Sequence, residues 1–92
     1  MVVGSSSSSL NVSQNKELSS LSVTSNELTG LDVTNNPQLT VLYCDQNQLS
    51  ELNVTNNTSL SILNCSSNDL KELNVSNLEL LSVLKCNSNP LW

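Results

Sequence analysis

The stretch LYCDQNQLSELNVTNNTSLSI occupies residues 42–62, and its pattern recurs along the chain at a fixed interval. Moved forward by 21 positions it falls on residues 63–83, and moved back by 21 it falls on residues 21–41, with nearly every apolar position kept. A fixed period of this length is typical of proteins in which each repeat stacks on its neighbours because it cannot bury its own apolar side. The sequence therefore predicts a repeat protein.

Each period divides into two similar halves, LDVTNNPQLTV at residues 31–41 and LYCDQNQLSE at residues 42–51. Both begin with apolar residues two positions apart, which predicts a short half-buried strand, and the Asn-rich segment that follows favours a turn. The segments between these strands are too short and too rich in Asn, Ser, Thr and Pro to favour a helix. We therefore expect an all-β repeat solenoid with two short parallel β-stacks and no or almost no α-helix. One stack is expected at residues 21–23, 42–44, 63–65 and 84–86, and the other at residues 10–12, 31–33, 52–54 and 73–75.

The repeat signature begins at residue 10 and divides the chain into two parts. Residues 1–9 contain a run of five serines and are interpreted as a linker or an artificial junction, in preference to an irregular first strand through Val2 and Val3. Residues 10–92 are expected to form a four-period solenoid without a recognisable cap at either end. Such a chain would be an excerpt or a repeating unit of a longer protein.

Within one coil the inward side chains are expected to be Leu42, Cys44, Asn47, Leu49, Leu52, Val54, Asn57 and Leu60, with their equivalents stacked on them one period away. The asparagines form two structural ladders, one of Asn26, Asn47, Asn68 and Asn89 and the other of Asn15, Asn36 and Asn57. A buried amide needs partners, and the backbone groups at the turns can supply them. In the last coil Leu78 takes the place of an asparagine, so the turn there is expected to close differently, with Asn77 as a candidate.

The pattern L-x-x-L-x-C-x-x-N-x-L at residues 39–49, 60–70 and 81–91 resembles the conserved segment of leucine-rich repeats. The remaining part of the period, LNVTNN at residues 52–57, is similar to the nested 21-residue class of bacterial leucine-rich repeats called IRREKO repeats. The match covers residues 10–92. This resemblance implies a coil or horseshoe with a ligand-binding face, and an extracellular or cell-surface location in a bacterium.

The composition argues against several classes of function. A net charge of −5 with three Lys plus Arg is unlike the basic surface of a nucleic-acid-binding protein, and no nucleic-acid partner is expected. No run is long enough for membrane insertion, and the first residues lack the basic and apolar parts of a signal peptide. The chain has no His, the commonest general base, so no cofactor and no enzymatic activity are expected. A glycosidase using Glu51 and Glu72 is a distant alternative, because these carboxylates are expected on a convex surface without a cleft.

Cys44, Cys65 and Cys86 recur once per period at equivalent positions, with Val23 at the first such position. A linear stack of strand residues does not provide the converging geometry that a zinc site needs. Neighbouring cysteines in this register project side by side, which disfavours disulfides, and no His is available to activate a nucleophile. We expect three free, buried thiols that fill a narrow core.

Three columns of residues are expected to face outward on the stack that contains the cysteines. These residues vary from coil to coil, which suits recognition of an irregular partner, although ordinary solvated sheet surface would look the same. The binding face predicted from them comprises Val41, Tyr43, Asp45, Ile62, Asn64, Ser66, Val83, Lys85 and Asn87.

The outward columns of the other stack are repetitive: Gly30, Glu51 and Glu72; Asn11, Asp32, Asn53 and Asn74; and Ser13, Thr34, Thr55 and Ser76. An array of this kind could order water or bind a repetitive glycan. Ordinary β-favourable surface pairs would give the same pattern.

Two classes of function remain. The first is a non-enzymatic recognition module of a bacterial surface or secreted protein, which binds a protein or a glycan. The second is a structural repeat or spacer, in which uncapped ends with open backbone groups and apolar cross-sections join copies end to end into a fibre.

Overall fold

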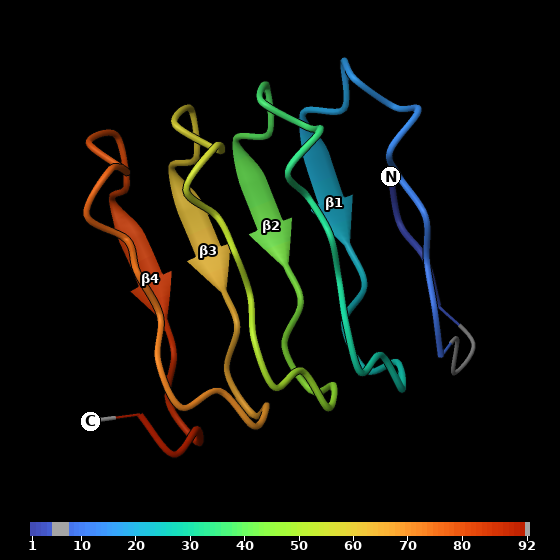
Figure 1. Ribbon diagram of the computed structural model, residues 1–92, viewed down its shortest axis with the longest axis vertical. Helices are drawn as coiled ribbons and strands as arrows, with labels where there is room; N and C mark the ends of the chain where they lie inside the picture. Colours follow the sequence, from blue (N-terminus) through green and yellow to red (C-terminus); the bar gives the residue numbers. More distant parts are fainter. Residues whose placement is uncertain (5–7, 92) are drawn as a thin grey trace.

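The computed structural model describes residues 1–4 and 8–91. Within them the chain forms a series of stacked coils with one parallel sheet and no helix, and it runs from the right to the left of Figure 1. The strands are β1 (Ser20–Ser22), β2 (Val41–Tyr43), β3 (Ile62–Asn64) and β4 (Val83–Lys85), and they pair in sequence order. Successive strands occupy equivalent positions of successive repeats, so each repeat contributes one rung to the sheet. The predicted all-β solenoid is confirmed.

Equivalent residues of neighbouring repeats lie side by side in the sheet. Leu42 of β2 pairs with Leu21 of β1 and with Leu63 of β3, which confirms the register predicted from the period. Backbone pairing between coils continues beyond the three-residue strands: Cys44 N donates to Asn64 O at 2.8 Å. Further along the coil, Gln46 N donates to Ser66 O of the following coil, and Gln48 N donates to Leu28 O of the preceding coil. Neighbouring coils are therefore joined along most of this side of the solenoid.

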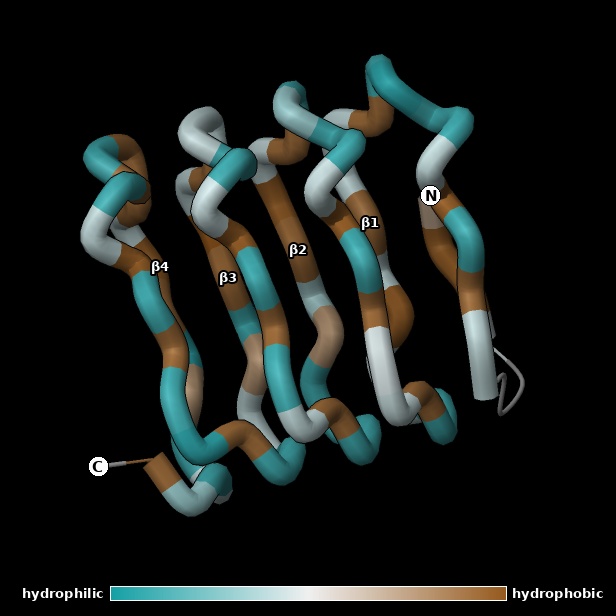
Figure 2. The backbone as a smooth tube through the Cα atoms, in the orientation of Figure 1, coloured by the Kyte–Doolittle hydropathy of each residue, from teal (hydrophilic) through white to brown (hydrophobic). Residues whose placement is uncertain are grey.

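The core is a set of apolar columns that run through the stacked coils. Leu21, Leu42 and Leu63 are fully buried, and in Figure 2 the first parts of strands β2 and β3 are brown. The equivalent Leu84 of β4 is 39% exposed, because the described chain places a neighbouring coil on only one side of it. Coil-to-coil contact, rather than burial within one coil, thus supplies the hydrophobic stabilisation.

The second β-stack predicted at residues 10–12, 31–33, 52–54 and 73–75 is wrong, since none of these described segments forms a strand. Their side chains instead satisfy the backbone locally: Asn53 Oδ1 accepts hydrogen bonds from Thr55 N at 3.0 Å and from Thr55 Oγ1 at 2.7 Å. Asp32 receives the same two bonds from Thr34. Such local bonds offer the backbone an alternative to a sheet ladder.

The first asparagine ladder joins adjacent coils through side-chain amides. Asn47 is 8% exposed, and its Nδ2 donates to Val23 O of the preceding coil at 3.0 Å and to Cys44 O of its own coil at 3.1 Å. Its Oδ1 accepts from Leu28 N at 3.0 Å. Asn68 repeats this arrangement one coil later, with donation to Cys44 O and acceptance from Leu49 N. Each amide thereby satisfies turn groups of two coils at once.

The second ladder is shorter than expected. Asn57 is fully buried and donates to Val33 O and Asn36 O, and Asn36 makes the corresponding bonds to the coil before it. Asn15, predicted to point inward, is exposed, because the described residues include no preceding turn whose carbonyls it could reach. The amide oxygens of Asn36 and Asn57 are buried and find no hydrogen-bond partner among the described residues. This ladder is therefore less completely satisfied than the first.

The turn at Leu78 closes in the same way as its equivalents, which corrects the expected role of Asn77. Leu78 N donates to Val75 O at 3.0 Å, and Leu81 N donates to Leu78 O at 3.1 Å. Backbone bonds alone make this turn, so no side-chain amide is needed to close it. Leu78 is buried at 6% exposure, whereas Asn77 is exposed.

The first three residues lie alongside β1 rather than apart from the solenoid. Val2 forms a parallel bridge with Ser22, Val3 N donates to Ser22 O, and Val3 packs against the core. This finding corrects the linker interpretation for Met1, Val2 and Val3. Residues 5–7 of the predicted linker and residue 92 of the predicted solenoid lie outside the described residues.

One left-handed residue precedes each asparagine of the first ladder. Ser25, Gln46, Ser67 and Ser88 have φ angles between 57° and 59°. A residue in this region turns the chain sharply, and here it directs the next residue, the ladder asparagine, into the coil. The region is sterically costly for residues with a Cβ, above all for β-branched ones.

We predict that Asn47→Ala destabilises the fold by roughly 1–3 kcal/mol, because the amide of Leu28 and the carbonyl of Val23 lose buried partners. Chemical denaturation measures this change. Gln48→Ala is the control, since Gln48 is exposed. Equal effects at the two positions would contradict the role of the ladder.

We also predict that Ser67→Val destabilises the chain by about 1 kcal/mol, because a β-branched residue is strained at a φ of 57°. Ser50→Val is the matched control: Ser50 is exposed and is not among the positive-φ residues. Thermal unfolding of both variants compares them. If Ser67→Val were as stable as Ser50→Val, the left-handed turn would not constrain the sequence.

Candidate binding site

The outward face of the sheet presents two columns of side chains. The register places Val41, Ile62 and Val83 side by side, and it does the same for Tyr43, Asn64 and Lys85. Val83 of β4 is 40% exposed and Tyr43 of β2 is 38% exposed, whereas Ile62 and Asn64 of β3 are half-buried. The structure thus brings together six of the nine residues predicted for a binding face, as an apolar column beside a mixed one.

The third predicted column requires a correction, because Asp45 and Ser66 are each only 9% exposed. Asp45 Oδ1 accepts a hydrogen bond from Thr24 Oγ1 at 2.8 Å, and Ser66 Oγ donates to Asn87 Oδ1 at 2.7 Å. These side chains therefore link neighbouring coils to one another. Asn87 is exposed, but its Oδ1 already accepts the hydrogen bond from Ser66.

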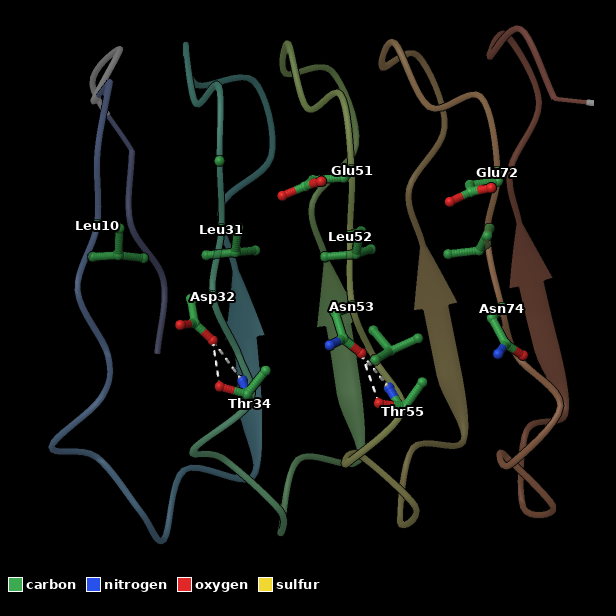
Figure 3. Close-up of a pocket in the computed structure, with 13 residues that line it drawn as sticks. Leu10, Leu31, Asp32, Thr34, Glu51, Leu52, Asn53, Thr55, Glu72 and Asn74 are labelled. Carbon is green, nitrogen blue, oxygen red and sulfur yellow. Dashed lines mark hydrogen bonds between the residues drawn. The ribbon is translucent and has the colours of Figure 1, made fainter.

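The opposite side of the solenoid carries a shallow groove (Figure 3). Leu10, Leu31 and Leu52 lie in one row along it, and Glu51 and Glu72 lie to one side of this row. The sequence-based expectation of a surface without a cleft at the two glutamates is therefore wrong. The groove exists because these segments form no sheet and their side chains stand apart between coils.

Paired polar residues lie on the other side of the leucine row. The two members of each pair are two positions apart in the sequence. Asp32 is bonded by Thr34 and Asn53 by Thr55, and Asn74 receives the same two hydrogen bonds from Ser76. The hydrogen bonds from Thr34 hold the pKa of the Asp32 carboxyl below its ordinary value. Sequence reasoning missed the groove, although the recurring (Asn or Asp)-x-(Ser or Thr) pattern signals these local bonds.

The cysteine column lies inside the coil, on the side of the sheet. Cys44 and Cys65 are buried, Cys86 is half-buried, and all three thiols are free. Burial raises the pKa of Cys44 strongly and raises that of Cys65 to about 11, with the neighbouring Cys86 as the second cause for Cys65. Within the described part of the chain no three His, Cys, Asp or Glu residues gather in a way that could hold a metal ion.

We predict that thiol reagents label the native chain in the order Cys86, Cys65, Cys44, because reaction needs an accessible thiolate and burial opposes both access and ionisation. Mass spectrometry at successive times measures the order on peptides cut after glutamate, because Glu51 and Glu72 separate the three cysteines. Unfolding in denaturant should make the three rates similar. Fast native labelling of Cys44, or stoichiometric zinc in the purified protein, would contradict this description of the column.

None of the described residues forms a helix that could cross a membrane. A scan against protein-family models finds no match, and a search of the curated proteins finds none either.

Solved structures do match the chain. The functional domain of InlJ from Listeria monocytogenes, which includes a cysteine ladder, superposes with a TM-score of 0.90 at 38% sequence identity over 91% of this chain. The fold is the leucine-rich repeat solenoid of the internalins. An internalin, InlF, from the same species superposes with a TM-score of 0.84 at 36% identity over 87% of this chain. The present chain spans 19% of the InlJ chain and 24% of the InlF chain.

The likeness to internalins bears on the cysteine column. The InlJ domain includes a cysteine ladder. In this chain Cys44, Cys65 and Cys86 each directly follow a strand, at equivalent positions of successive coils. The identity of 38% over 91% of this chain indicates likeness beyond the backbone path alone.

Proposed function

We propose that this chain is a non-enzymatic recognition module of a bacterial surface or secreted protein and binds a protein partner through the outward face of β1–β4. The observation that carries the proposal is the contrast between the inner and outer columns of the same strands. Inside, Leu21, Leu42 and Leu63 are identical. Outside, Tyr43 is followed in register by Asn64 and Lys85. An identical scaffold with varied surface residues suits a partner whose surface is irregular.

The chemistry of the face supports a protein partner. The column of Val41, Ile62 and Val83 offers apolar area, and Tyr43 beside it combines an apolar ring with a hydroxyl group. Aromatic side chains of this kind are enriched among the residues that dominate protein interfaces. The resemblance to nested 21-residue bacterial repeats, and the structural likeness to the internalins, agree with the proposed bacterial surface or secreted location.

We predict that peptides selected on the native chain from a phage-displayed library of random 12-residue sequences bind Tyr43→Ala at least about tenfold more weakly, because truncation removes a central aromatic anchor. Surface plasmon resonance measures the affinity. Gln48→Ala, an exposed change away from the face, is the control and should bind as the native chain does. Ile62→Ser is a second variant of the same face. Selected peptides whose affinity neither substitution changes would overturn the assignment of the face.

A second candidate function, end-to-end assembly of copies, is favoured by the exposed apolar groups of the fourth coil. Leu84 is 39% exposed and Leu80 is 64% exposed, although the positions equivalent to Leu84 in β1–β3 are fully buried. At the other edge, Val3 packs against the core beside β1. If the β1 edge of a second copy docked against β4, it would cover Leu84 with another coil. Such a head-to-tail contact need not close into a ring.

We predict concentration-dependent self-association of the 92-residue chain, weakened by Leu84→Lys because a charge would enter the new apolar contact. Sedimentation velocity over a concentration series measures it. Asn77→Lys places the same charge at an exposed position of the same coil and should have little effect. A single monomeric species over the whole series would exclude assembly without affecting the proposal for the sheet face.

A further inference from the structure

The groove on the side opposite the sheet consists of three rows that run from coil to coil (Figure 3). A central apolar row contains Leu31 and Leu52, which are 8% and 7% exposed and form a thin floor. Glu51 and Glu72 line one side of this floor, and paired polar residues line the other. A ligand lying along the solenoid would therefore meet the same kind of groups at every coil.

The hydrogen bonds within each polar pair fix what the groove offers to a ligand. The hydroxyl protons of Thr34 and Thr55 are donated to Asp32 Oδ1 and Asn53 Oδ1, at 2.6 Å and 2.7 Å. A hydroxyl has one proton and two lone pairs, so these oxygens present acceptors to the outside. Glu51 adds a carboxylate that only accepts, whereas the Nδ2 group of Asn53 can donate outward. The groove is thus rich in acceptors with donors interspersed.

Most of the polar pairs along the groove are neutral. Two of the three, Asn53 with Thr55 and Asn74 with Ser76, are amide and hydroxyl groups, and the pair of Asp32 and Thr34 carries a charge. The glutamate row is incomplete, because Gly30 stands at the position equivalent to Glu51 and Glu72. Each of the three coils nevertheless places one carboxylate at the groove, that of Asp32, Glu51 or Glu72, and no lysine lines it. An anionic polymer would therefore be repelled along the whole length, and the ligand has to match acceptors and amides over an apolar floor.

We propose that this groove binds a neutral polysaccharide lying along the solenoid axis. Its hydroxyl groups supply the donors that the threonine and glutamate oxygens need, and they can also accept from the Asn53 amide. The C–H surfaces of its rings cover the leucine floor, and its repeating units match a surface that repeats at each coil. The site is distinct from the sheet face and does not depend on the function proposed for that face.

Affinity electrophoresis tests the proposal. The native chain is run in gels that contain xylan, dextran or a soluble β-glucan, and retardation gives the dissociation constant. We expect retardation by at least one of these polymers, and weaker binding of its short oligosaccharides because they contact fewer coils. Asn53→Ala should raise the dissociation constant about three- to tenfold, since one or two hydrogen bonds are lost.

Asn11→Ala is the matched control, because Asn11 also accepts a hydrogen bond from the residue two positions on but does not line the groove. It should bind the polymer as the native chain does. Gly30→Glu provides an independent reading: a Cβ at Gly30 meets no atom within 4 Å, so the change keeps the fold and adds an acceptor to the incomplete row. We expect it to maintain or strengthen binding.

Four outcomes would overturn the proposal. The first is the absence of retardation by every neutral polymer. The second is retardation that Asn11→Ala reduces as much as Asn53→Ala does, which would indicate a general effect on the fold. The third is binding restricted to poly-L-lysine and abolished by Glu51→Gln, which would make the groove a surface for basic peptides. The fourth is loss of retardation in Tyr43→Ala alone, which would assign the sugar to the sheet face.

Discussion

The carboxamide of an inward asparagine is the interaction on which the stacked coils most depend. Asn47 donates to a carbonyl of its own coil and to one of the preceding coil, and it accepts from a third backbone group. Each of these groups lies at a turn that the three-residue strands cannot reach. Without the Asn47 amide, Leu28 N would be left unpaired in the interior at a cost of about 1–3 kcal/mol, whereas the two carbonyls keep Asn26 and Asn68 as donors. The ladder thus allows tight turns to be buried between coils, and burial of the leucine columns follows from that.

The period of the sequence was sufficient to predict which residues stack, since Leu21, Leu42 and Leu63 pair as expected. It could not show that only one half of each repeat forms a sheet. Both halves begin with the same Leu-x-(Val or Cys) pattern, and an alternation of two positions predicts a strand in either. The difference lies in the next polar residues: Asn53 and Thr55 bond to each other and to the local backbone, which competes with pairing between coils.

The candidate binding face shows a similar limit of pattern reasoning. Alternation correctly directs Val41 and Tyr43 outward, but β2 ends at Tyr43. Beyond the end of a strand the period of two no longer sets the direction of a side chain, and Asp45 turns toward Thr24 of the neighbouring coil. The groove was missed for a related reason, because a surface expected to be a flat sheet leaves no room for one. The two faces therefore differ in both shape and chemistry.

The leucine at position 78 has a consequence for how the solenoid comes apart. Two asparagine ladders couple the coils, but the second ladder ends at Asn57. Leu78, at the next equivalent position, has no group that could donate to the carbonyls of the preceding coil. In a one-dimensional stack, the free energy of each interface decides whether neighbouring units unfold together. The last interface is the weakest in these terms. We therefore expect the fourth coil to open while the first three remain closed, and amide exchange would report this opening as a distinct step.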